Sequence, residues 1–198
     1  MKFSKYIINM WPPIIDGYLV RSCITDRVSN AFSQYLQVKL TEYVQKCGNC
    51  FWLSELECQN HKHKLDYMVI RGSYDNYLKS MRDGKDIRWT TLIEAQWGNN
   101  NQKKINDFLD RDFPKLFEWD QQFQDQIKVA LVDTTGHPGD SFEVHASLIK
   151  RMHSKVKTND PHSKFLYLFT AVKFKKKLIY FTFSDGKSKP SNKVQGYT

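Results

Sequence analysis

Apolar and polar positions along the chain follow two different periods, and this pattern predicts the order of its helices and strands. Apolar residues recur at helical spacing from Thr25 or Asp26 to about Lys46, from Ile105 to Phe117 and from Phe142 to Val156. Short runs rich in β-branched and aromatic residues predict strands at 65–70, 89–97, 127–132, 165–174 and 178–183. The chain therefore alternates helices with strands and is expected to build an α/β (α+β) fold.

The connections between these segments indicate how the strands pair. Residues 175–177 form a turn so short that the flanking strands can only make a hairpin. Residues 71–89 indicate a short helix or an elaborated hairpin connection, and Pro114 is expected to kink or shorten the helix that contains it. The order predicts a mixed central sheet of about five or six strands flanked by helices.

Length and linker composition predict one domain. We expect a single domain over residues 1–184, with its core at about 60–175, and a basic C-terminal tail at 185–198 that could be flexible. The apolar runs are far shorter than a bilayer requires, and the residues after Met1 do not continue into a signal-peptide core. The expectation is a soluble, cytoplasmic protein without a membrane partner.

The charge balance favours a polyanionic partner. The chain carries 30 Lys and Arg against 21 Asp and Glu, a formal net charge of +9. Nucleic acid is the first partner that such an excess suggests, although an ordinary basic surface gives the same count.

One strand combines acidic and amide side chains with apolar ones. Within 91–99, Glu94 and Gln96 point to the same face because a strand alternates its sides. A carboxylate inside an apolar strand is costly unless something pairs with it, and a divalent cation suits a carboxylate beside an amide oxygen. Asp66, near the beginning of the preceding strand, supplies a second carboxylate. Glu94 and Asp66 are therefore candidate metal ligands.

The amino-acid sequence of these strands resembles that of a known family, the PD-(D/E)XK nucleases. The run Thr91-Leu92-Ile93-Glu94-Ala95-Gln96-Trp97-Gly98-Asn99 resembles the catalytic strand of the BglII, BstYI and BamHI group of type II restriction endonucleases, where Glu-x-Gln or Glu-x-Glu replaces the commoner Glu-x-Lys. Leu65-Asp66-Tyr67 is similar to that group's upstream strand, and Lys128-Val129-Ala130 and Thr135-Gly136-His137 to its later strand and turn. The resemblance covers roughly residues 64–155.

This resemblance implies a restriction-endonuclease-like fold and a Mg²⁺-dependent double-stranded DNA endonuclease that acts as a homodimer on a short palindromic site. Asp66 and Glu94 would hold one or two Mg²⁺ ions, and the backbone carbonyl of Ala95 could add a ligand. Gln96 would orient the attacking water, and Asn99 matches a position that tunes the site. Gln96 cannot act as a general base, because an amide does not titrate in this range.

Two points about the acidic ligands stay open. Asp66 lies 28 positions before Glu94, a longer gap than the family pattern, so residues 71–89 would be an insertion. Asp86 is the competing ligand at the shorter spacing, but its context is a turn and we favour Asp66. Glu57, or Glu55, could add a further carboxylate, with Glu57 the better placed, although exposure is the commoner state of such residues.

Three cysteines and a histidine have the spacing of a possible zinc site. The pattern Cys47-x2-Cys50-x7-Cys58-x2-His61 offers the residue types that tetrahedral Zn²⁺ requires, with His63 as a substitute. Free cysteines beside a basic histidine run are the alternative interpretation.

Two basic segments are candidates for contact with DNA. One begins a helix and the other lies within a later helix, and both could equally be ordinary charged helix ends. The candidate residues are Asn100, Lys103, Lys104, Arg151, His153 and Lys155.

Two rival functions remain open at this point. One is a repair, phage or mobile-element nuclease on the same fold, with structure rather than sequence specificity. The other is a DNA-binding protein, possibly zinc-stapled, that has lost its cleavage activity.

Overall fold

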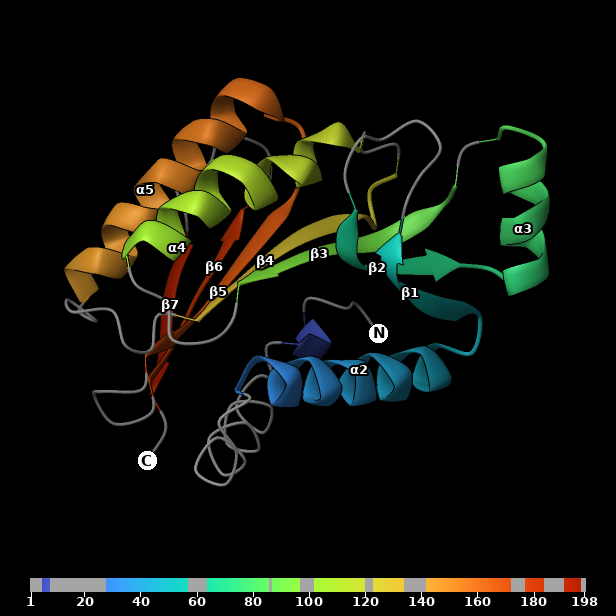
Figure 1. Ribbon diagram of the computed structural model, residues 1–198, viewed down its shortest axis with the longest axis horizontal. Coiled ribbons are helices and arrows are strands. Elements are labelled where there is room, and N and C mark those ends of the chain that lie inside the picture. The colour runs from blue at the N-terminus through green and yellow to red at the C-terminus, as the bar shows by residue number, and fades with distance from the viewer. Residues whose placement is uncertain are drawn as a thin grey trace.

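The computed structural model describes nine stretches of the chain (Figure 1). These are residues 5–7, 28–56, 64–85, 87–96, 102–119, 123–133, 142–171, 177–183 and 191–196.

Helices and strands follow one another in the order that the hydrophobic pattern predicts, with some additions. The elements are α2 (Val28–Cys47), β1 (Cys50–Leu56), β2 (Leu65–Arg71), α3 (Tyr74–Arg82), β3 (Trp89–Gln96), α4 (Gln102–Asp107), η1 (Phe108–Asp112), η2 (Phe113–Glu118), β4 (Ile127–Asp133), α5 (Phe142–Asn159), β5 (Phe165–Ala171), β6 (Lys177–Phe183) and β7 (Ser191–Gly196). The additions are β1, β7 and the separate turns η1 and η2, whereas the helix α3 is the short helix, one of the two structures expected for residues 71–89.

The seven strands of the described stretches belong to one mixed sheet, in which they stand in chain order from β1 to β7. Strands β1, β2 and β3 pair antiparallel, β3, β4 and β5 pair parallel, and β5, β6 and β7 pair antiparallel. The mixed sheet is confirmed, but the expected five or six strands are too few. The segment Ser191–Gly196 is polar and shows no apolar alternation, so the sequence pattern does not predict it as a strand. It pairs with β6 through backbone bonds, which an edge strand makes to one neighbour alone.

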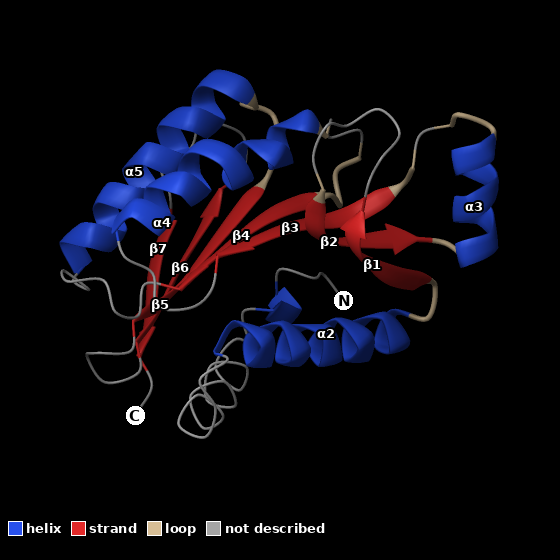
Figure 2. Ribbon diagram, viewed as in Figure 1, coloured by secondary structure: helices blue, strands red, loops and turns tan. Residues whose placement is uncertain are grey.

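Helices cover both faces of the sheet, and each face has its own core (Figure 2). The segment from α4 to η2 and helix α5 pack on one face, around buried residues such as Phe108, Phe113, Met152 and Tyr167. Helix α2 packs on the other face through Leu36, Leu40 and Tyr43, joined by Tyr6 and Ile7 from the N-terminal turn. Within the described residues, no helix combines the length and hydropathy needed to cross a membrane.

The period-two alternation of the strands decides which face each side chain joins. On β2, Met68 lies in the core beneath α4 and α5, whereas Val69 lies in the core against α2. On β3, Leu92 and Ile93 divide in the same way. Asp66 is in step with Met68, and Glu94 is in step with Leu92, so both carboxylates belong to the α4 and α5 face of the sheet.

The helix that follows β3 changes its winding before Pro114. Proline has no N–H to donate to the carbonyl four residues back, and its ring clashes with that carbonyl. The five residues before Phe113 form a π-helical turn, closed by the Phe113 N–H donating to the Phe108 carbonyl, and a 3₁₀ helix follows with Pro114 in its first turn. The expected kink is thus a change of helix type, and it sets which residues face β3.

Candidate functional site

Strands β2 and β3 stop pairing where the two candidate carboxylates lie. The antiparallel register ends at Tyr67 and Ile93, so the next two residues, Asp66 and Glu94, stand opposite one another beyond the ladder. The Ala95 N–H donates to Asp66 Oδ2 at 2.8 Å, and the Asp66 N–H donates to Glu94 Oε1 at 3.3 Å. We call the point where β2 and β3 stop pairing, at Asp66 and Glu94, the fork. There, side-chain hydrogen bonds replace the ladder bonds, and each carboxylate is oriented by the backbone of the opposite strand.

Both carboxylates are held where a negative charge is unfavourable. Glu94 is 1% exposed, and burial, with the nearby charge of Asp66, raises its pKa from 4.5 to about 9. Burial likewise raises the pKa of Asp66 from 3.8 to about 6, although the Ala95 N–H and the charge of Lys115 oppose the rise. The fork therefore favours a proton or a cation on its carboxylates.

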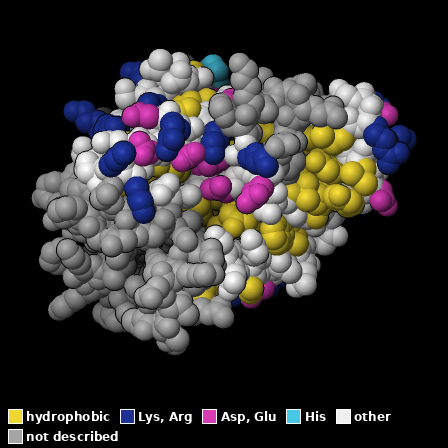
Figure 3. Space-filling view, viewed as in Figure 1, with side chains coloured by type: hydrophobic (Ala, Val, Ile, Leu, Met, Phe, Trp, Pro, Cys, Tyr) yellow, Lys and Arg dark blue, Asp and Glu magenta, His cyan; other side chains and the backbone are white. Residues whose placement is uncertain are grey.

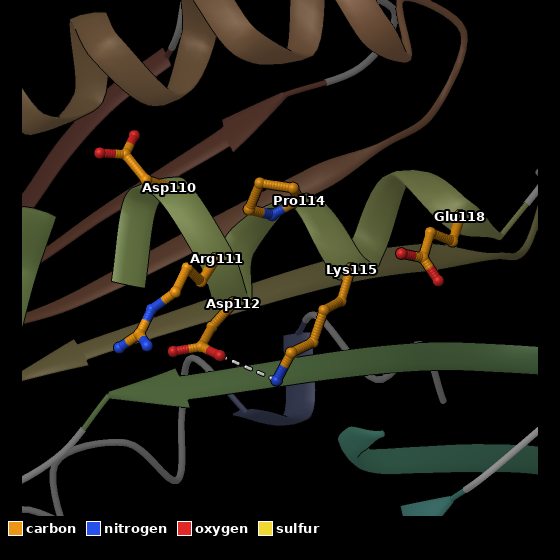
Figure 4. Close-up of a pocket in the computed structure, with 6 residues that line it drawn as sticks. All are labelled: Asp110, Arg111, Asp112, Pro114, Lys115 and Glu118. Atoms are coloured by element: carbon orange, nitrogen blue, oxygen red, sulfur yellow. Dashed lines mark ion pairs between the residues drawn. The ribbon is translucent and has the colours of Figure 1, made fainter. Parts of the chain in front are cut away.

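The helical segment after β3 brings one cation and one further carboxylate to the fork. Lys115 Nζ lies 2.8 Å from Asp112 Oδ1 and 3.7 Å from Glu94 Oε2. Figure 4 shows the Lys115 and Asp112 side chains extending from the helix on the side of β3. Burial opposes the charged form of Lys115, but Asp112, Glu94 and Asp66 outweigh it and raise its pKa. Lys115 is therefore charged at neutral pH.

A hollow of about 520 Å³ lies along this helical segment (Figure 4). Its lining carries both signs of charge, negative from Asp110, Asp112 and Glu118 and positive from Arg111 and Lys115, and it is completed by Pro114. The hollow gives access to the side of Lys115, whose side chain is 18% exposed.

Glu55 extends the carboxylate pair by one strand. It stands between the register pairs Ser54–Tyr67 and Leu56–Leu65, and so lies opposite Asp66 on β1. Its negative charge contributes to the raised pKa of Asp66. Its φ of 48° is left-handed, a conformation that residues other than glycine adopt uncommonly. Glu57, the favoured candidate for this role, lies outside the described residues, as does Asp86, the rival of Asp66.

The other residues expected at the site occupy different positions. Gln96 ends β3, partly buried and two residues beyond Glu94 on the same face. Ala95 lies on the opposite face and packs against the core over α2. Asn99 lies outside the described residues.

Two of the five candidate zinc ligands, the substitute His63 included, lie in the described residues. Cys47 ends α2 and Cys50 begins β1, and both are free, partly buried thiols. Burial and the neighbouring Cys47 raise the pKa of Cys50, which favours its neutral form over the thiolate that zinc requires. Cys58, His61 and His63 lie outside the described residues.

Of the candidate DNA contacts, two are exposed and three are engaged or partly buried. Lys103 and Lys104 are exposed on α4. Arg151 donates to Asn106 Oδ1 at 2.8 Å, and Lys155 lies 3.2 Å from Asp110 Oδ1, so both tie α5 to the segment after β3. His153 is partly buried, and its pKa is lowered by burial and by Lys157. Asn100 lies outside the described residues.

The surface beside the fork combines three kinds of side chain. On the face seen in Figure 3, Lys and Arg side chains gather with Asp and Glu side chains over the α4–η2 segment. A hydrophobic area adjoins them in the direction of α3.

Sequence reasoning missed Lys115 and Asp112 as members of the site. Their spacing of three residues predicts a helical pair, but it does not indicate which face of the helix meets β3. That face is set by the change of winding before Pro114, which no hydrophobic pattern specifies.

The two carboxylates supply oxygen ligands of the kind that a hard cation prefers. Within the described part of the chain, no group of three or more His, Cys, Asp or Glu side chains is arranged to hold a metal ion. Mg²⁺ is usually held through one or two carboxylates, with the remaining positions taken by water and substrate phosphate. Asp66 and Glu94 fit that requirement, since both are oxygen ligands whose raised pKa values show that their negative charge is incompletely compensated.

Comparison with known proteins does not place the chain in a family. No family model matches it, and no curated protein matches it. Among solved structures, the central domain of yeast acetyl-CoA carboxylase aligns with 83% of this chain at 10% identity and a TM-score of 0.41. The chain spans 25% of that structure's length, and a likeness at this level carries no argument about function.

Proposed function

We propose that this protein is a Mg²⁺-dependent endonuclease of double-stranded DNA, built on a restriction-endonuclease-like fold. The observation that carries the proposal is the pair of facing carboxylates, buried Glu94 and partly buried Asp66, at the fork between two neighbouring strands. An acidic pair with raised pKa values is costly to maintain, and such groups cluster at functional sites.

The arrangement agrees with the resemblance to PD-(D/E)XK nucleases. That resemblance requires an Asp on one strand and Glu-x-Gln on the next, close enough to share a cation. Asp66 and Glu94 stand opposite one another although 28 positions separate them in sequence, because α3 takes up the extra chain between β2 and β3, and this supports the proposal.

Each residue has a role that follows from its chemistry. Asp66 and Glu94 would hold Mg²⁺, which when bound polarises a phosphodiester and lowers the pKa of water. The backbone N–H groups of Ala95 and Asp66 fix the two carboxylates in place before the cation arrives. Gln96 can orient the attacking water through its amide, but it cannot take the proton.

Long-range charge supports a DNA substrate. The net charge of +9 favours rapid, salt-sensitive encounter with a polyanion. Lys103 and Lys104 are exposed on the helix that follows β3, where they could contact backbone phosphates.

A plasmid assay tests the proposal. Supercoiled plasmid is incubated with the protein and MgCl₂, MnCl₂ or EDTA, beside Asp66→Asn and the control Asp75→Asn, an exposed carboxylate of α3. We expect nicked and linear products with either metal, for the wild type and the control alone. Tight binding without cleavage under all metal conditions would contradict the nuclease and favour a DNA-binding protein.

The same protein can be tested for sequence specificity and oligomeric state. Digestion of a mapped phage genome is expected to give discrete fragments, and sedimentation is expected to give a dimer, because a two-fold protein places one site on each strand. A smear, or a preference for branched DNA, would favour a structure-selective nuclease.

A further inference from the structure

We infer that Lys115 supplies the positive charge that contacts the scissile phosphate. This inference rests on the proposed function, because it assigns a catalytic residue to the same site.

The first observation is the charge balance around the fork. Asp66, Glu94 and Asp112 bring three carboxyl groups together, and among the described residues Lys115 is a cation whose charge acts on both strand carboxylates. A bound phosphodiester would add its own negative charge beside these three carboxyl groups. Stabilising that charge as the pentacovalent phosphorus forms requires a donor close by.

The second observation is the position of the Lys115 ammonium group. It carries three N–H donors, and two carboxylates lie near it, Asp112 at 2.8 Å and Glu94 at 3.7 Å. These contacts occupy at most two donors. Asp112 fixes the ammonium group beside Glu94, and the hollow along the helix leaves its side chain partly accessible.

Two other cations in the neighbourhood do not have this position. Arg111 is 73% exposed and its ion pair is with Asp107 at 3.6 Å. Lys128 is fully buried in the sheet and bonds to the Trp119 carbonyl and to Asp160. Lys115 is thus both accessible and in contact with Glu94.

The test removes the positive charge of Lys115 from the helix and then returns a positive charge from a position on strand β3. Lys115→Met removes the charge, and Lys115→Arg keeps it. The double variant Gln96→Lys with Lys115→Met places an ammonium group two residues beyond Glu94, on the same face of β3. Lys79→Met, an exposed lysine of α3, is the matched control.

We expect Lys115→Met to lower the rate of plasmid cleavage by about 100-fold or more, as the loss of a charge-stabilising donor does. DNA binding in EDTA should change by less than about threefold, since a single phosphate contact contributes little to the total. The double variant should recover at least about tenfold of the lost rate, because the donor is again within reach of the same phosphate. Lys115→Arg should exceed Lys115→Met, and the control should match the wild type.

Two results would overturn this assignment. One is cleavage by folded Lys115→Met within about threefold of the wild type. The other is equal loss in folded Lys115→Met and folded Lys115→Arg with no recovery in a folded double variant, which would make Lys115 a structural ion-pair partner. If Lys115→Met fails to fold, Lys115→Gln takes its place in both arms of this comparison. A wild type and a control that are both inert would refute the proposed function as well, so the two failures are distinguishable.

Discussion

Glu94 is a carboxylate held at a cost in stability, and Glu94→Gln should therefore stabilise the metal-free protein. Its pKa is raised from 4.5 to about 9, chiefly by burial. The folded state then binds more protons than the unfolded state between these two values. Stability is fully present below pH 4.5 and is lost as the pH rises towards 9.

The size of the effect follows from linkage. Each pH unit within that interval costs about 1.4 kcal/mol, which gives an upper bound of about 5 kcal/mol at pH 8 and about 1 kcal/mol at pH 5. Relaxation of the site reduces the bound, so we expect Glu94→Gln to stabilise by about 2 to 4 kcal/mol at pH 8. Glutamine retains the size of the side chain and an oxygen that accepts from the Asp66 N–H.

Urea denaturation in EDTA at pH 5 and pH 8 measures this difference. Asp75→Asn, which removes an exposed carboxylate, serves as the control for a general effect of charge. The reasoning is refuted if Glu94→Gln shifts stability equally at both pH values, or destabilises the protein at pH 8.

Three further outcomes are expected. Binding of Mn²⁺ or Mg²⁺ should tighten about tenfold per pH unit from pH 6 to 9, because the cation displaces the Glu94 proton; calorimetry in buffers of different ionisation heat measures the released proton, and a flat profile would be inconsistent with this linkage. Asp66→Ala should abolish detectable cleavage while circular dichroism stays native, whereas loss of the fold would show that the Ala95 N–H bond is essential to the sheet. Lys128→Ala should destabilise by about 3 kcal/mol or more, since it leaves Asp160 without its buried partner; a melting temperature unchanged from the wild type would disprove that role.

The sheet could be predicted from the sequence wherever its strands are buried on both faces. Strands β3, β4 and β5 are central, so they are rich in apolar, β-branched and aromatic residues that predict strands. Strand β7 could not be predicted, because an edge strand such as Ser191–Gly196 needs little apolar surface. Its pairing with β6 depends on backbone bonds that any sequence can make.

The candidate site was predictable in its strand residues and not in its helical ones. Asp66 and Glu94 interrupt apolar strands in step with buried neighbours, which is a local signal. Lys115 reaches Glu94 from 21 positions further along the chain. That contact depends on the π-helical turn before Pro114, and hence on tertiary packing rather than on local pattern.

The central claim is that Asp66 and Glu94 hold the divalent cation on which cleavage of DNA by this protein depends. Its most direct test is the rate of supercoiled plasmid cleavage as a function of Mg²⁺ concentration, for the wild type and for folded Glu94→Gln. We predict a saturable, Mg²⁺-dependent rate for the wild type and no cleavage above background for the variant. Equal rates for the two proteins, or a rate that persists in EDTA, would contradict the account.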